Sequence, residues 1–582
     1  MRDHTTLRTR SDPTRSGQPY IYRRKTLGAW IACLFFFSAG LALIPHAGIQ
    51  NDEALFAAAI YRPRAEVYAI HVGRSHIPLM LISYLGALKS LIYKPILLAF
   101  GTGLFALRVP MLLAGTASVW LLFLLARRIS GERAALIGCC LLAVDSMYLI
   151  TACFDWGPVA LQHLLMVGGA LLLVRFYQER QAWALAGGFF LFGLAMWDKA
   201  LAVWMLSGMA VAGISTLPRQ ILATITVRRG AIAVAAFVLG ALPLVVYNVG
   251  DDWGTLHGNW TRDTRHIPGK ARFLMQTESG ALFGWLSAPD WQTPKPQPPH
   301  GLAQSASARI SALARKPKNF PLFYAFVLAL LVAPLAGRNG IRAILFCLVT
   351  MAVAWIQMAV NANTGGSVHH TILLWPIPEL IIGISFAAAS QRLGRAGIPA
   401  LGAAMAILLV SGALVINQYY FELWRYGGAQ NWTEAIFALS DYVRGVHAEN
   451  LVCMDWGLTE PLRLLDRGKL PLIWGGDALS KPEMSDEDRR TAMWMLSEPA
   501  NVYIAHTKEF TFFTLPSANL TRFAENSGYR RTVMAVISDG YGRRVYEVYR
   551  FEGAGQAGMP VPRSLERQPD TADHDPQLAL VH

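Results

Sequence analysis

The chain has 582 residues, of which 53% are hydrophobic and only 15% are charged, and its mean hydropathy is +0.34. A soluble protein of this length would carry more charge, and repeated apolar runs long enough to cross a bilayer indicate a polytopic membrane protein. The formal charge of +14 does not require nucleic acid as a partner, because much of it lies in the N-terminal arm and in short loops, where basic residues act as topology signals. The cysteines show neither metal-ligand spacing nor a disulfide framework.

Apolar runs recur along most of the chain and predict about eleven transmembrane helices. The first run follows a basic arm of residues 1–26, whose polar second half is unlike a cleavable signal, so it is predicted to be a retained helix. An odd number of crossings would place the two termini on opposite sides of the membrane. The predicted spans are 27–45, 108–126, 134–150, 157–176, 182–197, 199–216, 230–247, 320–337, 341–360, 371–389 and 398–417.

Arginines are distributed unevenly among the loops that join these spans. If the N-terminus is cytoplasmic, the arginine-rich loops are cytoplasmic, and the loops 151–156 and 361–370, which contain no Lys or Arg, lie outside. Residues 76–93 are apolar but interrupted by Pro78 and Lys89, so we expect a surface-lying or re-entrant helix there. A membrane crossing by that segment would invert every later loop.

Three polar regions are expected on the outer side, and the first is the loop 46–107. The second, 248–318, contains four tryptophans and a basic cluster, and loops of this length are usually lids or disordered. The third, 418–552, predicts a small α/β module with a helix at 431–446, strands at 450–454 and 501–505, and a hairpin of 531–538 with 543–550. The Pro- and charge-rich residues 553–582 are expected to be disordered.

Under this topology the unusual polar residues near the ends of the apolar runs fall on the outer side. Polar groups at such boundaries are costly unless they are paired or face water, so their shared side suggests a site. Each also has a simpler explanation: the acidic pair would cap a short helix, the lone aspartate would cap the helix after it, the lysine would extend toward the interface, and the histidines would form an interfacial pair. The residues are Asp52, Glu53, Asp155, Asp198, Lys199, His369 and His370.

Four short motifs occur in the first half of the chain: Asp52-Glu53 after the first helix, His76-Ile-Pro78, Phe100-Gly101 with Ala106-Leu-Arg-Val-Pro110, and Trp197-Asp-Lys199. Together they resemble the GT-C membrane glycosyltransferases, within the branch of the protein O-mannosyltransferases, the lipid A aminoarabinose transferases and the galacturonosyltransferases of lipopolysaccharide. The resemblance covers about residues 27–390 and does not extend to the C-terminal module.

The resemblance implies a polytopic α-helical protein of the GT-C type, with its transferase domain at 27–417. It implies transfer of a sugar from a polyprenyl-phosphate donor to an extracytoplasmic protein, lipid or glycan acceptor. It also implies location in the bacterial inner (plasma) membrane, with a cytoplasmic N-terminus and the C-terminal module outside. Membrane lipid is an expected partner and nucleic acid is not. No cofactor is required by the resemblance; a divalent cation would be compatible with it, but no residues support a metal site.

The residue types suit this chemistry. A carboxylate can accept the proton of an acceptor hydroxyl or amine, and a departing lipid phosphate needs cationic groups that stabilise its charge. The resemblance implies inverting single displacement, with Asp52 as general base and Glu53 as a structural or acceptor-orienting neighbour. The expected donor- and acceptor-binding residues are Asp155, Lys199, His369, His370, Arg74, His76, Arg262 and Arg265.

Two other classes of function remain open. A transporter or flippase of lipid-linked sugars would also place polar residues among membrane helices, although here they lie at one face rather than at the midplane. A membrane-anchored scaffold whose C-terminal module binds a partner would leave the acidic motif unused. Formation of product from a polyprenyl-phosphate sugar would separate the three.

Overall fold

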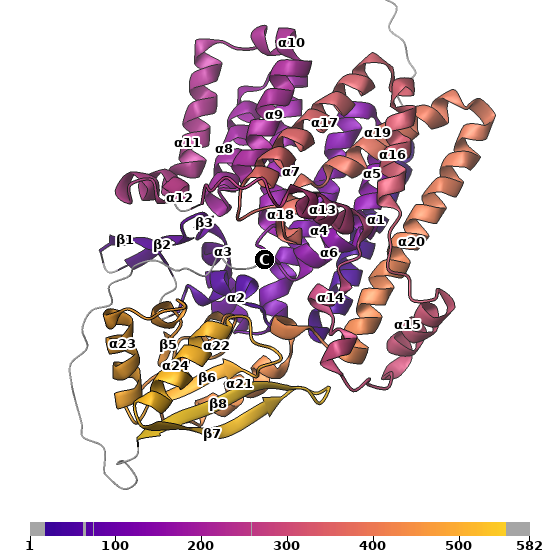
Figure 1. Cartoon of the computed structure of the whole chain (residues 1–582). Helices are drawn as coiled ribbons and strands as arrows, with labels where there is room; N and C mark the ends of the chain where they lie inside the picture. The colour runs from indigo at the N-terminus through magenta and orange to yellow at the C-terminus, as the bar shows by residue number, and fades with distance from the viewer. Residues whose placement is uncertain (1–17, 62–65, 74, 258, 554–582) are drawn as a thin grey trace, which may run out of the picture.

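The structure is a computed structural model that describes residues 18–61, 66–73, 75–257 and 259–553. Residues 1–17 of the basic arm and residues 554–582 of the predicted tail lie outside the described residues. Long apolar helices form one part of the molecule, and a five-stranded sheet with its own helices forms another (Figure 1). Short helices and a three-stranded sheet lie where the two parts meet.

Each predicted span contains a helix, as expected for apolar runs whose backbone polar groups must bond to one another in lipid. The main helices are α1 (Gln18–Leu43), α4 (Leu104–Ser130), α5 (Glu132–Val144), α6 (Ser146–Cys153), α7 (Ala160–Glu179), α8 (Ala182–Asp198), α9 (Ala202–Thr216), α11 (Val227–Gly250), α16 (Leu322–Val332), α17 (Gly337–Val360), α19 (Ile377–Arg392) and α20 (Gly397–Tyr426).

Fewer helical segments than predicted are long and apolar enough to cross a membrane. Seven helical segments in the described residues are long and apolar enough to cross a membrane, or eight if the bent pair α5–α6 counts as one. The helices α8 and α9 are shorter, and α16 and α17 belong to one candidate span of 39 residues. The protein is therefore a helical membrane protein, while the predicted count of about eleven is not confirmed.

The span predicted at 134–150 is broken at Asp145, where α5 and α6 meet at 63°. Asp145 has an extended backbone and caps α6, because its carboxylate accepts a hydrogen bond from the Tyr148 backbone N–H at 2.8 Å. The other carboxylate oxygen accepts a hydrogen bond from Trp375 Nε1 at 3.0 Å. A capping aspartate thus ends one helix and starts the next within the bundle.

The helix expected at 76–93 is wrong over its first half. Strand β1 (Tyr68–Val72) pairs with β2 (Ser75–Ile82), which pairs with β3 (Leu85–Gly86) in an antiparallel sheet, and only then does α3 (Leu88–Phe100) begin. The apolar run did not reveal this strand because its pairing partner, β1, lies outside the run. The structure therefore has no membrane-crossing helix over 76–93.

The C-terminal region contains a sheet with strand order β5-β4-β6-β8-β7. The predicted helix, both predicted strands and the predicted hairpin are confirmed by α21 (Ala435–Arg444), β4 (Leu451–Cys453), β6 (Val502–His506), and β7 (Tyr529–Ser538) with β8 (Arg544–Gly553). Parallel β5 (Leu472–Trp474) and the helices α22 (Thr459–Leu465), α23 (Asp486–Ser497) and α24 (Thr514–Asn526) complete the region.

The loop 248–318 is not irregular throughout. It contains α12 (Gly254–His257), α13 (Ile267–Ser279), α14 (Phe283–Leu286), η2 (Asp290–Gln292) and α15 (Gly301–Leu313). Its residues near 295 are tied to the turn between β7 and β8, since the Lys295 backbone N–H donates to the Tyr541 carbonyl at 2.9 Å. The loop 248–318 and the C-terminal region are therefore in contact.

Candidate functional site

The acidic motif lies at the start of α2 (Asn51–Ala58), directly after the first membrane helix and the short turn η1 (Ile44–His46). Gln50 caps α2: its side-chain oxygen accepts a hydrogen bond from the Asp52 backbone N–H at 2.6 Å. The Gln50 backbone N–H in turn donates to Glu53 Oε1 at 3.0 Å. This capping box satisfies two backbone donors that a helix N-terminus otherwise leaves free. The simpler explanation of the motif as a helix cap is thus correct for Glu53.

Glu53 is also bound by Arg108, a residue of α4, and both side chains are almost fully buried. The Arg108 guanidinium donates to the two Glu53 oxygens at 2.6 and 2.9 Å. Its remaining N–H groups donate to the carbonyl oxygens of Ile44, Ala47 and Gly48 at 2.6 to 2.9 Å. Charge-assisted bidentate pairs of this kind fix geometry as well as charge. Arg108 and Glu53 therefore hold the chain segment that leads to Asp52.

Asp52 points to a different set of neighbours from those of Glu53, as adjacent positions on a helix do. Burial raises the pKa of Asp52, and the positive charges of Lys199 and Lys89 act in the opposite direction. The carboxylate of Asp155 is close enough to raise the pKa further. Asp52 is therefore a carboxylate with increased basicity, placed among two lysines and a second carboxylate.

Asp155 lies between α6 and α7, in the loop at 154–159, with a left-handed backbone (φ 46°). Its Oδ2 accepts a hydrogen bond from Lys89 Nζ at 2.6 Å, and both side chains are buried. Lys89 is the second residue of α3, and its Nζ lies over the Phe56 ring of α2, 4.1 Å from the ring centroid. Asp155 Oδ1 has no hydrogen-bond partner among the described residues. The pair thus joins α2, α3 and the loop before α7 at one place.

Lys199 follows the last residue of α8 and is buried. Its Nζ donates to the Gly157 carbonyl oxygen at 2.6 Å, and its own carbonyl accepts a hydrogen bond from Gln162 at 3.0 Å. Burial and the nearby charge of Lys89 lower the pKa of Lys199 to about 7. Near neutral pH this amine is therefore only partly charged and would gain charge beside an anion.

The two histidines are in the short helix α18 (Val368–Thr371), with ring centroids 4.2 Å apart. Gly157 packs so tightly on His369 that an added Cβ would lie 1.9 Å from the His369 Cβ. His369 therefore contacts the loop 154–159. The same loop contains Asp155, and its Gly157 carbonyl accepts the hydrogen bond from Lys199. The His370 ring nitrogen Nδ1 accepts a hydrogen bond from the Gly365 backbone N–H at 3.2 Å.

Other candidate residues have different surroundings. His76 pairs with Glu66 and contacts His71 within the β1–β2 hairpin. Arg262 and Arg265 are exposed, and Arg265 pairs with Asp263 at 3.2 Å. Arg74 lies outside the described residues. The functional roles assigned to these residues stay predictions.

Sequence reasoning did not assign a role to Lys89 or to Arg108, although each left a signal. Lys89 is a single cation within an apolar run, where an unpaired charge would be expensive, and Arg108 lies within the Leu-Arg-x-Pro motif. Asp198, next to Lys199, is fully buried, and neither of its carboxylate oxygens has a hydrogen-bond partner among the described residues. In those same parts of the chain, no group of three or more His, Cys, Asp and Glu side chains is arranged to hold a metal ion.

A family model and solved structures relate the chain to known proteins. The family model of dolichyl-phosphate-mannose-protein mannosyltransferase matches residues 88–246. ArnT from Cupriavidus metallidurans bound to undecaprenyl phosphate has a similar structure, with a TM-score of 0.53 and 13% sequence identity over 94% of this chain and 100% of that chain. For the same protein in the apo state the TM-score is 0.52 and the sequence identity 14%, over 91% of this chain and 98% of that chain. No curated protein matches the sequence.

These matches confirm the predicted resemblance to the GT-C membrane glycosyltransferases. The matched range 88–246 contains Lys89, Arg108, Asp155 and Lys199, whereas Asp52 precedes it. At this level of identity the structural likeness establishes the fold, and the chemistry depends on the residues described above.

Proposed function

We propose that this membrane protein with a GT-C fold transfers a sugar from a polyprenyl-phosphate donor to an extracytoplasmic acceptor, with Asp52 as general base. The observation that carries the proposal is the gathering of Asp52 with Asp155, Lys89 and Lys199 in one cluster, in which Asp52 is partly exposed and the other three side chains are buried. These residues come from the ends of different helices, so the cluster lies at one end of the bundle rather than at its middle. Such a position suits an enzyme acting at the lip of a bilayer better than a transport path.

The two lysines would bind the donor phosphate. A polyprenyl phosphate that leaves the sugar carries negative charge, and preorganised cations stabilise that charge most strongly in a site from which water is excluded. Among the residues that the structure describes, Lys199 Nζ donates to a carbonyl oxygen and to no carboxylate, so no carboxylate in direct contact neutralises its charge. Lys89 donates to Asp155, which holds the amine in position near Lys199. His369 and His370 would line the sugar side of this site.

Asp52 would remove the proton from the acceptor. The acceptor oxygen or nitrogen attacks the anomeric carbon, the bond to the phosphate oxygen breaks, and the lipid phosphate leaves with the electron pair while the proton moves to Asp52. The configuration at the anomeric carbon inverts in this single displacement. Glu53 does not share the proton transfer, because its oxygens are bound to Arg108 and to the Gln50 backbone.

The nature of the donor is supported by the similar ArnT structure, which is described as bound to undecaprenyl phosphate. A polyprenyl tail would lie between helices in the lipid, leaving the phosphate at the lysines. We also propose the bacterial inner membrane, a transferase domain at 27–417 and an extracytoplasmic module at 418–552. A compartment-specific reporter fused after Gly553 tests this topology: activity restricted to the cytoplasm would invert the site and refute it.

The proposed function is tested with the purified protein in nanodiscs, given radiolabelled polyprenyl-phosphate sugars and an extract of cell-envelope acceptors. The expected result is transfer of the radiolabelled sugar to an acceptor, together with release of polyprenyl phosphate. Asp52→Asn should lose both. Movement of the labelled lipid between leaflets without release of polyprenyl phosphate would instead indicate a flippase. If polyprenyl phosphate is not released and the labelled lipid does not move, the protein would act as a membrane-anchored scaffold.

A further inference from the structure

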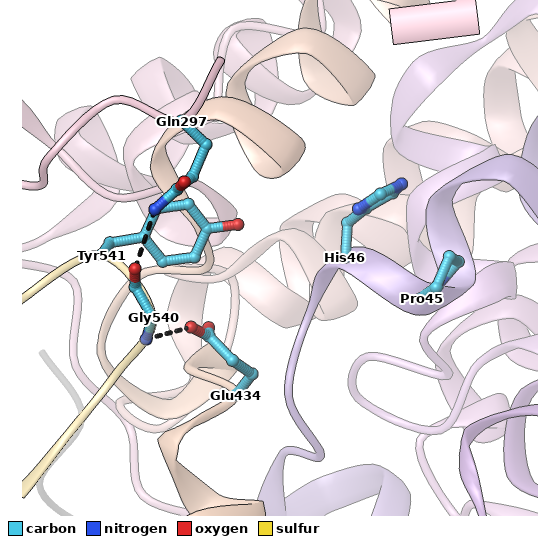
Figure 2. Close-up of a pocket in the computed structure, with 6 residues that line it drawn as sticks. All are labelled: Pro45, His46, Gln297, Glu434, Gly540 and Tyr541. Atoms are coloured by element: carbon cyan, nitrogen blue, oxygen red, sulfur yellow. Dashed lines mark hydrogen bonds between the residues drawn. The ribbon is translucent and has the colours of Figure 1, made fainter. Parts of the chain in front are cut away.

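A cavity of about 310 Å³ lies away from the lysine cluster, where three distant parts of the chain meet (Figure 2). One wall comes from the turn after the first membrane helix, another from the outer loop, and the third from the C-terminal region. The β7–β8 turn is bonded to the neighbouring segments through Gly540 and Tyr541. The lining residues are Pro45, His46, Gln297, Glu434, Gly540 and Tyr541.

The walls of this cavity are held in place by their own contacts. Glu434 Oε1 accepts a hydrogen bond from the Gly540 backbone N–H at 2.9 Å, and the Gln297 amide donates to the Gly540 carbonyl at 2.8 Å (Figure 2). The Tyr541 hydroxyl lies 3.2 Å from the carbonyl oxygens of Leu423 and Trp424, to which it donates. These bonds fix the aromatic ring before any ligand arrives, which lowers the entropic cost of binding.

The chemistry of the lining is polar with one rigid aromatic surface. Glu434 lines the cavity, and its Oε2 atom is buried without a hydrogen-bond partner among the described residues. An imidazole, an amide and a carboxylate around a fixed ring can bind hydroxyl groups while the ring packs against an apolar face. Pro45 is the one aliphatic residue among the six that line the cavity, so the lining favours a ligand with both a polar and an apolar face.

The cavity adjoins the segment between η1 and α2, which leads to Asp52. His46 precedes Asp52 by six residues, which limits their separation to about 22 Å at 3.3–3.6 Å per residue. The Gly48 backbone N–H donates to the Trp432 carbonyl at 2.6 Å, two residues before Glu434. None of the described residues of the proposed reaction site lines the cavity, so a group bound there lies beside the segment that leads to Asp52 and is not the reacting group.

We propose that this cavity binds a non-reacting sugar of the acceptor, and that the acceptor is a neutral glycan of more than one sugar. The proposal rests on the proposed function, because it names the class of acceptor for that reaction. Binding energy from a remote part of a substrate can be used to position the reacting part. A glycan extending from the cavity would bring a hydroxyl group of a neighbouring sugar toward Asp52.

The test uses an array of neutral and acidic oligosaccharides and purified full-length protein in nanodiscs, without donor. Gly540→Leu fills the cavity, because an added Cβ would lie 3.3 Å from Glu434 Oε1. Glu434→Gln keeps an acceptor for the Gly540 N–H but removes the charge. Gly284→Leu is the matched control, since its Cβ would meet no atom within 4 Å. Thermal unfolding of each variant is measured in parallel.

We expect the wild type and Gly284→Leu to bind neutral oligosaccharides equally. Gly540→Leu should abolish this binding, and Glu434→Gln should weaken it about tenfold or more through loss of one charge-assisted hydrogen bond. Binding of no neutral glycan by the wild type, or unchanged affinity in both cavity variants, would overturn the proposal. If Gly540→Leu does not fold, Glu434→Gln alone decides.

This assay separates the cavity from the proposed reaction. Asp52→Asn should retain glycan binding while it loses sugar transfer. Transfer from a polyprenyl-phosphate sugar without glycan binding would refute the cavity and leave the reaction standing. Glycan binding without transfer would refute the reaction and leave the cavity standing.

Discussion

The substitution Asp52→Asn separates chemistry from structure at the acidic motif. The Asp52 backbone N–H, not its side chain, is bonded to Gln50, so asparagine should preserve the helix cap. Loss of an acid–base group lowers turnover by roughly 10²–10⁴-fold, which is about 2.7–5.4 kcal/mol of transition-state stabilisation at 1.36 kcal/mol per decade. Donor binding should change little, or tighten slightly, because removal of one negative charge leaves both lysines in place.

The assay is single-turnover transfer with saturating donor, combined with titration of donor binding on the same preparation. Glu53→Gln is the contrasting variant, because it removes a charge of the same sign one residue away and should act through stability instead. Near-normal turnover of Asp52→Asn would refute its role as the base. Loss of donor binding in that variant would show that Asp52 holds the donor or a bound ion.

Further predictions concern the buried charges around the motif. Glu53→Gln should destabilise the protein by about 3–5 kcal/mol, because it leaves Arg108 charged without its partner. A double-mutant cycle with Arg108→Met measures the coupling energy of the pair. Additive effects of the two substitutions on the free energy of unfolding would contradict this coupling. Lys199→Ala should raise the donor concentration required more than the acceptor concentration; unchanged kinetics would remove Lys199 from the site. In the wild type, donor affinity should fall by up to about tenfold per pH unit above 7. The reason is that Lys199, with its pKa of about 7, is protonated below that pH and neutral above it. Donor binding by Lys199→Ala, measured over the same pH range, should lack this decline. Lys89→Met should weaken donor binding and leave Asp155 without its partner; Lys89→Arg should restore part of the affinity, and equal affinity in all three proteins would show that Lys89 does not contact the donor.

The pH dependence of turnover provides a check on Asp52. Burial raises its pKa, so protonation should remove the base at a higher pH than it would for an ordinary aspartate, and turnover should fall as the pH decreases through that value. The measurement is single-turnover rate against pH at saturating donor. An acid limb at the pH expected for a fully exposed aspartate would contradict the partly buried position of this carboxylate.

The sequence by itself determined which segments form apolar helices and which polar residues lie at the ends of those segments. Helix formation by an apolar run depends on bonds within that run, and the alternating pattern around Asp539-Gly-Tyr-Gly542 specifies a hairpin locally. The acidic motif was recognised for a similar reason, since a helix cap is a local feature. The helix expected across 76–93 was wrong because a strand depends on a partner elsewhere in the chain.

Only the tertiary structure decided which polar residues act together. The pairing of Lys89 with Asp155 joins residues 66 positions apart, and Arg108 binds Glu53 across 55 positions. The cavity at Glu434 has walls from residues near 45, 297 and 540. Sequence spacing carries no information about such contacts, because they arise when helices pack and bring their ends together. The energy of a buried charge depends on the partner that it meets after packing, so its role is settled only in the folded chain.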